Sequence, residues 1–167
     1  AMRYLSELAR VWNGKPELTI APTLRLAEMN AKKGNVEEAQ KALAKIIEIA
    51  ETNTKVKPYD VIKAVDLSAD LYQKADKVDD AAKRYSFVLA KYEADHNLSE
   101  ERYKLGELYF KKGEVKKAES IWADLKGEGS KFWAKISADK LKQSQWKDDY
   151  KKYLKRIPAM SKIEEQQ

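Results

Sequence analysis

The sequence contains no cysteine and a single histidine, His96. Disulfide frameworks, thiolate zinc sites and histidine clusters for a metal or a proton relay are therefore excluded. The lack of cysteine is compatible with the cytoplasm and with the periplasm, so the compartment stays open. His96 lies between Asp95 and Asn97, at an expected junction of two helices. We expect it to be exposed there or to cap a helix.

Glycine and proline are also scarce, with six and four residues among 167. This scarcity favours helices over a turn-rich β architecture. No apolar run approaches the roughly 18 residues that a membrane span needs, so no span is expected. The charge is mixed, since 33 basic residues against 27 acidic ones leave a net +6. The length suits one ordinary domain.

Catalytic motifs are missing as well. The chain has no glycine-rich phosphate loop, no G-x-S-x-G elbow and no H-E-x-x-H motif. The paired carboxylates at 37–38, 79–80 and 148–149 lie near expected helix starts, where negative charge is favourable. We therefore expect a chain that is not an enzyme, with no catalytic residues, no cofactor and no metal site.

Three segments share small and large residues at matching offsets. In each, a valine lies three residues before an alanine, and a large residue follows four after it. These positions are Val36, Ala39 and Leu43, then Val78, Ala81 and Tyr85, then Val115, Ala118 and Trp122. Residues four apart share a helix face, so the large side chain fills space beside an alanine at which two helices approach closely.

The third segment carries further matching residues: Leu105, Gly106, Tyr109 and Gly113. With Ala118 and Trp122, they resemble the tetratricopeptide repeat, a 34-residue helix-turn-helix unit whose signature includes L-G-x-x-Y. The other two segments are degenerate. Asp76 takes the place of the turn glycine in the second, and Asn30 that of the first-helix tyrosine in the first.

The resemblance implies an all-α fold, a right-handed superhelical stack of antiparallel helix pairs. Three pairs are expected within residues 17–129, at about 20–53, 62–95 and 99–132. Pro22 and Pro58 are expected in the first turns of helices at 22–33 and 58–75. Residues 1–16 have the spacing of the second helix of a truncated preceding repeat, so the chain is expected to be a fragment.

Two apolar faces follow the third pair. Phe132, Trp133 and Ile136 make one face, and a second is formed by Trp146, Tyr150 and Tyr153. They predict a divergent C-terminal capping helix pair over 130–156, with helices at 131–143 and 146–156. Residues 157–167 are expected to be a frayed tail.

In this family, fixed positions of each first helix line a concave groove. Carried over by position, the resemblance implies a partner-binding groove made of Leu24, Glu28, Lys32, Lys63, Asp66, Asp70, Lys74, Tyr103, Glu107, Phe110 and Lys111. Each unit has a carboxylate with a lysine four residues later, at 28 and 32, 70 and 74, and 107 and 111. One interpretation is that the carboxylates bind a basic or amphipathic segment, with apolar contacts from positions 24, 103 and 110. The other is that they form i,i+4 ion pairs with the lysines, each of which stabilises its helix by about 0.2–0.5 kcal/mol.

The resulting hypothesis is a non-catalytic protein–protein interaction scaffold for a protein or peptide partner. Glu28 and Asp70 stand where chaperone-tail binders of the family carry an asparagine, and their charge would repel a terminal carboxylate. The alternative is an assembly module, a homo-oligomer formed through its terminal helices, where Leu8 and Trp12 are apolar. Nucleic acid is the less favoured partner of the lysine-rich C-terminal segment, because exposed lysines are the usual solvated face of a helix.

Overall fold

The computed structural model describes residues 3, 7, 15–125 and 128–164, with no side chains described for 128 and 157–164. Every element in this part of the chain is helical, which confirms the predicted all-α fold. The elements are α2 (Pro16–Lys32), α3 (Val36–Thr52), α4 (Pro58–Lys74), α5 (Val78–Tyr92), α6 (Ser99–Lys111), α7 (Val115–Trp122), the short 3-10 helix η1 (Glu128–Ser130) and α8 (Lys131–Glu164).

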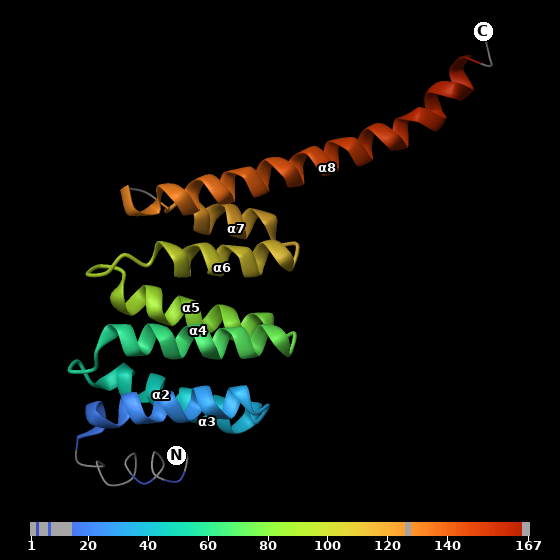
Figure 1. Ribbon diagram of the computed structural model, residues 1–167. Coiled ribbons are helices and arrows are strands. Elements are labelled where there is room, and N and C mark those ends of the chain that lie inside the picture. The colour runs from blue at the N-terminus through green and yellow to red at the C-terminus, as the bar shows by residue number, and fades with distance from the viewer. Residues whose placement is uncertain (1–2, 4–6, 8–14, 126–127, 165–167) are drawn as a thin grey trace.

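The helices stack as consecutive antiparallel pairs (Figure 1). α2 packs on α3, α4 on α5 and α6 on α7, while α3 against α4 and α5 against α6 join one pair to the next. α8 forms the last layer and contacts both α6 and α7. Each pair therefore touches only its neighbours, as in a solenoid.

The three predicted close-contact alanines, Ala39, Ala81 and Ala118, are fully buried. The large residues that follow them are buried too, at positions 43, 85 and 122. A Cβ atom on Gly106 would collide with the indole ring of Trp122. The glycine of the L-G-x-x-Y motif is thus required by the size of Trp122.

The turns inside the three pairs share one geometry. Gly34, Asp76 and Gly113 all have positive φ, at 81°, 57° and 86°. In each turn the next residue's N–H bonds back to a carbonyl five residues earlier, at 2.9 Å in all three cases. This is the Schellman motif, which ends a helix with a left-handed residue. Asp76 therefore has the conformation that glycine adopts in the other two turns.

The start of the first pair differs from the prediction. α2 begins at Pro16, not at 22, so Pro22 lies inside the helix. Proline is favourable at the first helical position because its missing N–H would have no partner there. Pro58 does begin α4, as predicted. Residues 1–2, 4–6 and 8–14, including the proposed association residues Leu8 and Trp12, lie outside the described residues.

The expected C-terminal capping pair is wrong, because α8 is one helix of 34 residues. No glycine or proline interrupts residues 143–146, so nothing ends the helix there. Trp146 lies 13 residues after Trp133, which at about 100° per residue turns the two side chains about 140° apart. The second apolar face is thus a second side of the same helix. The tail expected at 157–167 is helical through Glu164.

Candidate functional site

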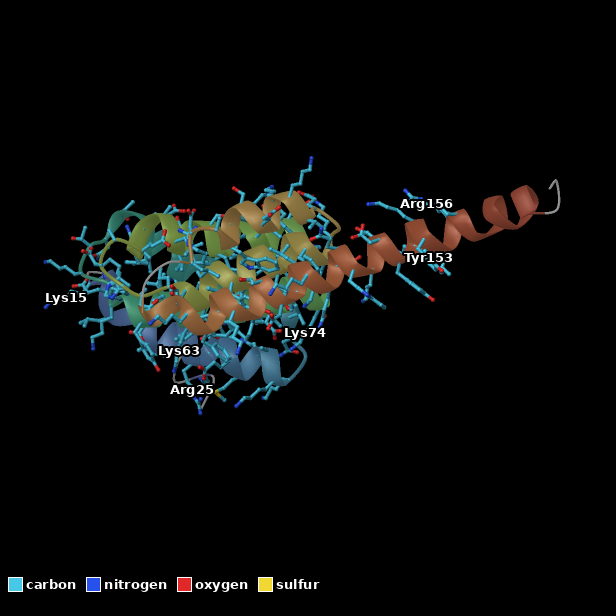
Figure 2. All side chains as sticks on the ribbon, turned by 90° about the horizontal axis from the view of Figure 1, so that it is seen from above. Lys15, Arg25, Lys63, Lys74, Tyr153 and Arg156 are labelled. Atoms are coloured by element: carbon cyan, nitrogen blue, oxygen red, sulfur yellow. The ribbon has the colours of Figure 1, made fainter. Side chains whose placement is uncertain are left out.

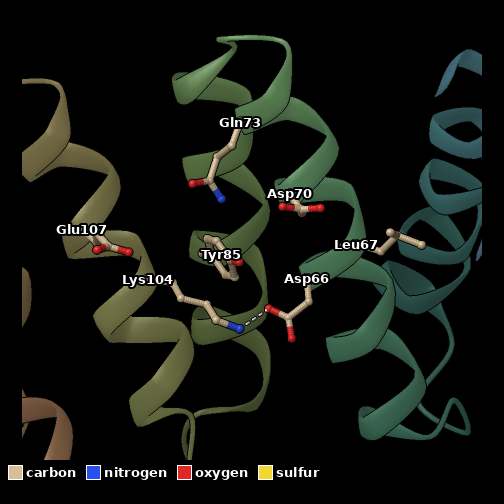
Figure 3. Close-up of a pocket in the computed structure, with 7 residues that line it drawn as sticks. All are labelled: Asp66, Leu67, Asp70, Gln73, Tyr85, Lys104 and Glu107. Atoms are coloured by element: carbon tan, nitrogen blue, oxygen red, sulfur yellow. Dashed lines mark hydrogen bonds and ion pairs between the residues drawn. The ribbon is translucent and has the colours of Figure 1, made fainter. Parts of the chain in front are cut away.

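The side of the stack formed by α2, α4 and α6 is hollowed. No Cα atom of α6 lies within 8 Å of one in α4, although α2 does contact α4. The resulting hollow between α4 and α6 has a volume of about 450 Å³. Figure 3 shows its lining residues: Asp66, Leu67, Asp70, Gln73, Tyr85, Lys104 and Glu107.

Lys104 crosses this hollow from α6. Its Nζ donates to Asp66 on α4 at 2.9 Å (Figure 3). The same Nζ lies 2.9 Å from a carboxylate oxygen of Glu100, one turn earlier on α6. Burial would lower the pKa of Lys104, but the bonds to Asp66 and Glu100 outweigh it and raise the pKa. Tyr85 is buried at the same hollow, where burial first and Asp66 second raise the pKa of its hydroxyl. Lys104 therefore stays cationic and Tyr85 neutral.

A second hollow of about 270 Å³ lies between α2 and α4. Leu67 and Asp70 line both hollows, so the two form one channel across the three helices. The remaining residues of the second hollow are Glu28, Ala31, Lys32, Leu71 and Lys74. We call this continuous surface the α2–α4–α6 channel.

The three carboxylates at the repeated position do not share one kind of partner. Asp70 accepts from Lys74 at 2.7 Å, the predicted i,i+4 contact. Glu28 instead pairs with Arg25 at 2.8 Å. Glu107 lies 3.7 Å from the Lys111 ammonium group and also contacts Lys140 of α8. All three carboxylates thus have a partner on their own helix, and Glu107 has a second one on α8.

Most of the predicted groove residues line these hollows or the adjoining one. Glu28, Lys32, Asp66, Asp70, Lys74 and Glu107 line the α2–α4–α6 channel. Lys111 lines a neighbouring hollow of about 340 Å³, which shares Gln73 with the channel. Lys63 is exposed on α4, with its ammonium group 4.7 Å from the centre of the Tyr59 ring.

Two of the three predicted apolar contacts of the groove, those of Leu24 and Tyr103, are wrong. Leu24 is 6% exposed and belongs to the core. Tyr103 is 7% exposed and packs against Trp133 of α8, with 4.9 Å between the ring centres. Phe110 packs against Trp122 at 5.6 Å and is partly buried. Helix α8 covers Tyr103, so this ring is not free to meet a partner, whereas Phe110 keeps part of its surface exposed.

Lys140 of α8 closes the channel at its third pair. Burial disfavours the charged form of Glu107, but Lys140 and Lys111 outweigh it and lower the pKa of this carboxyl group. The Lys140 ammonium group also lies 5.4 Å from the centre of the Tyr103 ring. Glu107 therefore helps to hold α8 on α6, a structural role in addition to lining the hollow.

Sequence reasoning missed Leu67, Tyr85 and Lys104 as lining residues. The Glu100–Lys104 spacing of four residues was the available signal for Lys104. Tyr85 was assigned only to packing, and the structure shows that it both packs and lines the hollow. No signal marked Lys140, because its role depends on the unexpected course of α8.

Other chemistry has little support in the described part of the chain. Within it, no group of three or more His, Cys, Asp or Glu side chains is placed to hold a metal ion. None of its helices combines the length and the apolar character needed to cross a bilayer. His96 is exposed, as expected, with its ring edge-on to Tyr92 at 6.2 Å between centres.

Comparison with known proteins supports the fold. The chain is similar to the crystal structure of BtubC (BKLC) from P. vanneervenii, a TPR-like protein, with a TM-score of 0.56 and 19% sequence identity. The match covers 72% of this chain and 51% of BtubC, so the chain spans about half the length of that protein. No protein-family model and no curated protein matches the sequence. The chain is a helical repeat-like all-α protein that resembles a TPR-like protein in structure.

Proposed function

We propose that this chain is a non-catalytic scaffold that binds a basic or amphipathic segment of a protein partner in the α2–α4–α6 channel. One observation carries the proposal: Asp66, Asp70 and Glu107 converge from two helices on one hollow. Lys104 is the one cation among the lining residues of this hollow, and it pairs with Asp66. The lysines that pair with Asp70 and Glu107 lie outside the lining, so a cation of a partner can compete with them for these carboxylates.

The ion pairs of the channel are weak enough for a cation of a partner to replace the lysine or arginine that now contacts each carboxylate. Asp70 and Lys74 are both mostly exposed, with side chains 52% and 70% accessible. Exposed pairs of this kind contribute only about 0.2–1 kcal/mol, so a lysine or arginine of a partner can replace Lys74 at little cost. At the other end of the channel Arg25 is 62% accessible and Glu28 33%, so a partner's cation can also replace the Arg25 guanidinium group beside Glu28.

Apolar contact comes from residues between the carboxylates. Leu67 lines both hollows and is only partly buried, and the partly buried Ala31 lines the one between α2 and α4. A channel with apolar residues at its centre and charges along its sides suits an amphipathic helix or an extended basic segment. Because the helices are already packed, the scaffold loses little conformational entropy on binding.

The test compares a peptide array bound by the wild type and by Glu28→Lys/Asp70→Lys. We expect the double variant to lose binding of lysine- and arginine-rich peptides while its helical circular dichroism and melting temperature stay near wild type. Glu107 is left unchanged because its contact with Lys140 holds α8. Binding by the wild type should weaken with added salt, since exposed charges are screened beyond about 8 Å at physiological ionic strength.

The matched control is Glu37→Lys/Asp80→Lys, which reverses two exposed carboxylates on the second helices of their pairs. These pair with Lys41 at 2.8 Å and Lys83 at 3.2 Å, like the channel carboxylates. The control has the same change in net charge, so it should keep the wild-type peptide profile. Equal profiles for the wild type and the channel variant would refute the proposal, as would equal losses in both double variants.

A further inference from the structure

The second half of α8 projects beyond the stack (Figures 1 and 2). Its 34 residues make a rod about 51 Å long at 1.5 Å per residue. Figure 2 shows Tyr153 and Arg156 on the projecting part, well away from the stacked pairs. Every residue from Gln145 to Arg156 is exposed.

Three aromatic residues line one side of this projecting half. Trp146, Tyr150 and Tyr153 are 66%, 47% and 60% exposed, and the rings of Trp146 and Tyr150 are stacked at 5.5 Å between centres. Their spacing of four and then three residues is the a/d pattern of a coiled coil. The sequence continues it with apolar residues at 157 and 160. We call Trp146, Tyr150 and Tyr153 the aromatic stripe.

The aromatic stripe lies on the side of α8 that faces away from the stack. Trp133, about 140° around the helix from Trp146, is the residue that packs on Tyr103 of α6. Ser137, one turn after Trp133, is buried on the same side. The side of α8 that faces away from the stack is thus aromatic and exposed.

We propose that the aromatic stripe binds the aromatic stripe of a second copy of this chain in an antiparallel α8–α8 pair. When Tyr150 of one copy faces Tyr153 of the other, the flanking Asp149 faces Arg156 of the other copy. The two-fold axis repeats both contacts, so the register gives two oppositely charged pairs. This charge complementarity identifies the second copy as the occupant.

The parallel arrangement lacks these pairs. Its flanking contacts join each residue to one five positions further along the other copy. Lys142 would then face Lys147, and Asp149 would face Leu154. Like charges at flanking positions disfavour that arrangement, so the antiparallel register is the one the charges select.

Within one copy, Asp149 makes only a weak, exposed ion pair. Lys152 donates to it at 3.2 Å, and both side chains are more than half exposed. Such a pair contributes little, so Asp149 is free to exchange it for Arg156 of a second copy. The other lysines of the projecting half, at 147, 151 and 155, stay in water beside and behind the aromatic stripe.

The first test is sedimentation equilibrium of the whole chain over a range of concentrations. We expect a monomer–dimer equilibrium in the wild type and a monomer in Tyr150→Glu/Tyr153→Glu, where carboxylates replace two aromatic rings. The matched control is Tyr59→Glu, which changes a tyrosine that is 65% exposed on α4. The control should dimerise like the wild type, and a wild type that stays monomeric throughout would overturn the proposal.

The second test exchanges the flanking charges. Asp149→Arg and Arg156→Asp should each weaken dimerisation about tenfold, because two attractive pairs become repulsive. The double variant restores opposite charges and should recover wild-type dimerisation. Weakening without recovery would refute the antiparallel register.

Two further outcomes separate the dimer from other occupants. Glu28→Lys/Asp70→Lys should dimerise normally, because the channel is not part of the α8–α8 contact. Loss of the dimer in that variant would show that α8 binds the channel of another copy and would refute the proposal. Binding of the monomer to phosphatidylserine vesicles through the aromatic stripe, with no dimer in solution, would refute it in favour of a membrane.

Discussion

The second and third helix pairs share one repeat pattern but fill it with different side chains. In the second pair, α5 has 15 residues, and buried valines at 61, 65 and 88 supply much of the core. In the third pair, α7 has only 8 residues, and the packing is aromatic, with Tyr103, Phe110, Trp122 and Trp133 in contact. A shortened second helix is thus compensated by larger rings and by a further helix, α8.

The largest effect should come from removing the central ring of the third pair. Trp122 stacks on Tyr103, packs against Phe110 and donates its indole N–H to the Tyr103 carbonyl oxygen at 3.0 Å. Trp122→Ala should therefore lower the free energy of unfolding by about 3–5 kcal/mol, measured by urea denaturation.

The control is Trp146→Ala at high dilution, where an exposed tryptophan is lost and a change within about 0.5 kcal/mol is expected. Similar costs for the two variants would mean that the aromatic cluster does not hold the third pair together.

A smaller effect should follow from filling the space beside Trp122. Gly106→Ala places a methyl group against the indole ring and should cost about 1–3 kcal/mol. At the matching positions the second pair combines Ala69 with Tyr85, so Trp122→Tyr in the Gly106→Ala background should recover part of the loss. Thermal melts of the two single variants and the double variant measure this coupling, and strict additivity would contradict the size relation.

The turns give a third comparison between the pairs. Gly113 has φ 86°, and a methyl group added there would meet no atom within 4 Å, so Gly113→Ala tests backbone conformation alone. We expect a cost of about 1 kcal/mol. Asp76 has φ 57° in the second pair, and Asp76→Gly should stabilise by less than about 1 kcal/mol. A destabilised Asp76→Gly variant in chemical denaturation would show that the aspartate side chain contributes more than its backbone strain.

The smallest effect concerns Glu101, which is buried at the start of α6. Burial raises the pKa of its carboxyl group above the ordinary value of 4.5. The folded state then binds the proton more tightly than the unfolded state, so ionisation of Glu101 destabilises the fold as pH rises past about 4.5. Glu101→Gln should raise the melting temperature at pH 7 and change it less in acid. An equal change at both pH values would contradict this linkage.

The sequence predicted the helix contacts and the turns correctly where only one type of residue fits a position. Ala39, Ala81 and Ala118 could be placed between helices because only a small side chain fits there, and the structure buries all three. Gly34 and Gly113 marked the turns because glycine tolerates positive φ. These rules use local spacing, which the sequence displays directly.

The parts of the site that could not be predicted depend on which distant helix covers a residue. Tyr103 occupies a groove position, and only the course of α8 decides that it is packed beneath that helix. The two apolar faces after residue 130 fit a helix pair and a single two-sided helix equally well, because both have the same periodicity. Tyr85 and Lys104 likewise line the hollow only because α4 and α6 are separated in space, which local spacing does not show.

Because α8 is one continuous helix anchored on the third pair, a rotation at the anchored end moves the whole helix. From Trp133, which rests on Tyr103, to Leu154 the helix advances about 32 Å without a joint. A tilt of α8 by about 10° about the contact between Trp133 and Tyr103 therefore displaces its far end by roughly 5 Å. Small changes in how the aromatic rings of the third pair pack against Trp133 would therefore shift the far end of α8 by several times as much. In the proposed antiparallel α8–α8 pair, such changes would alter the spacing between the two stacks.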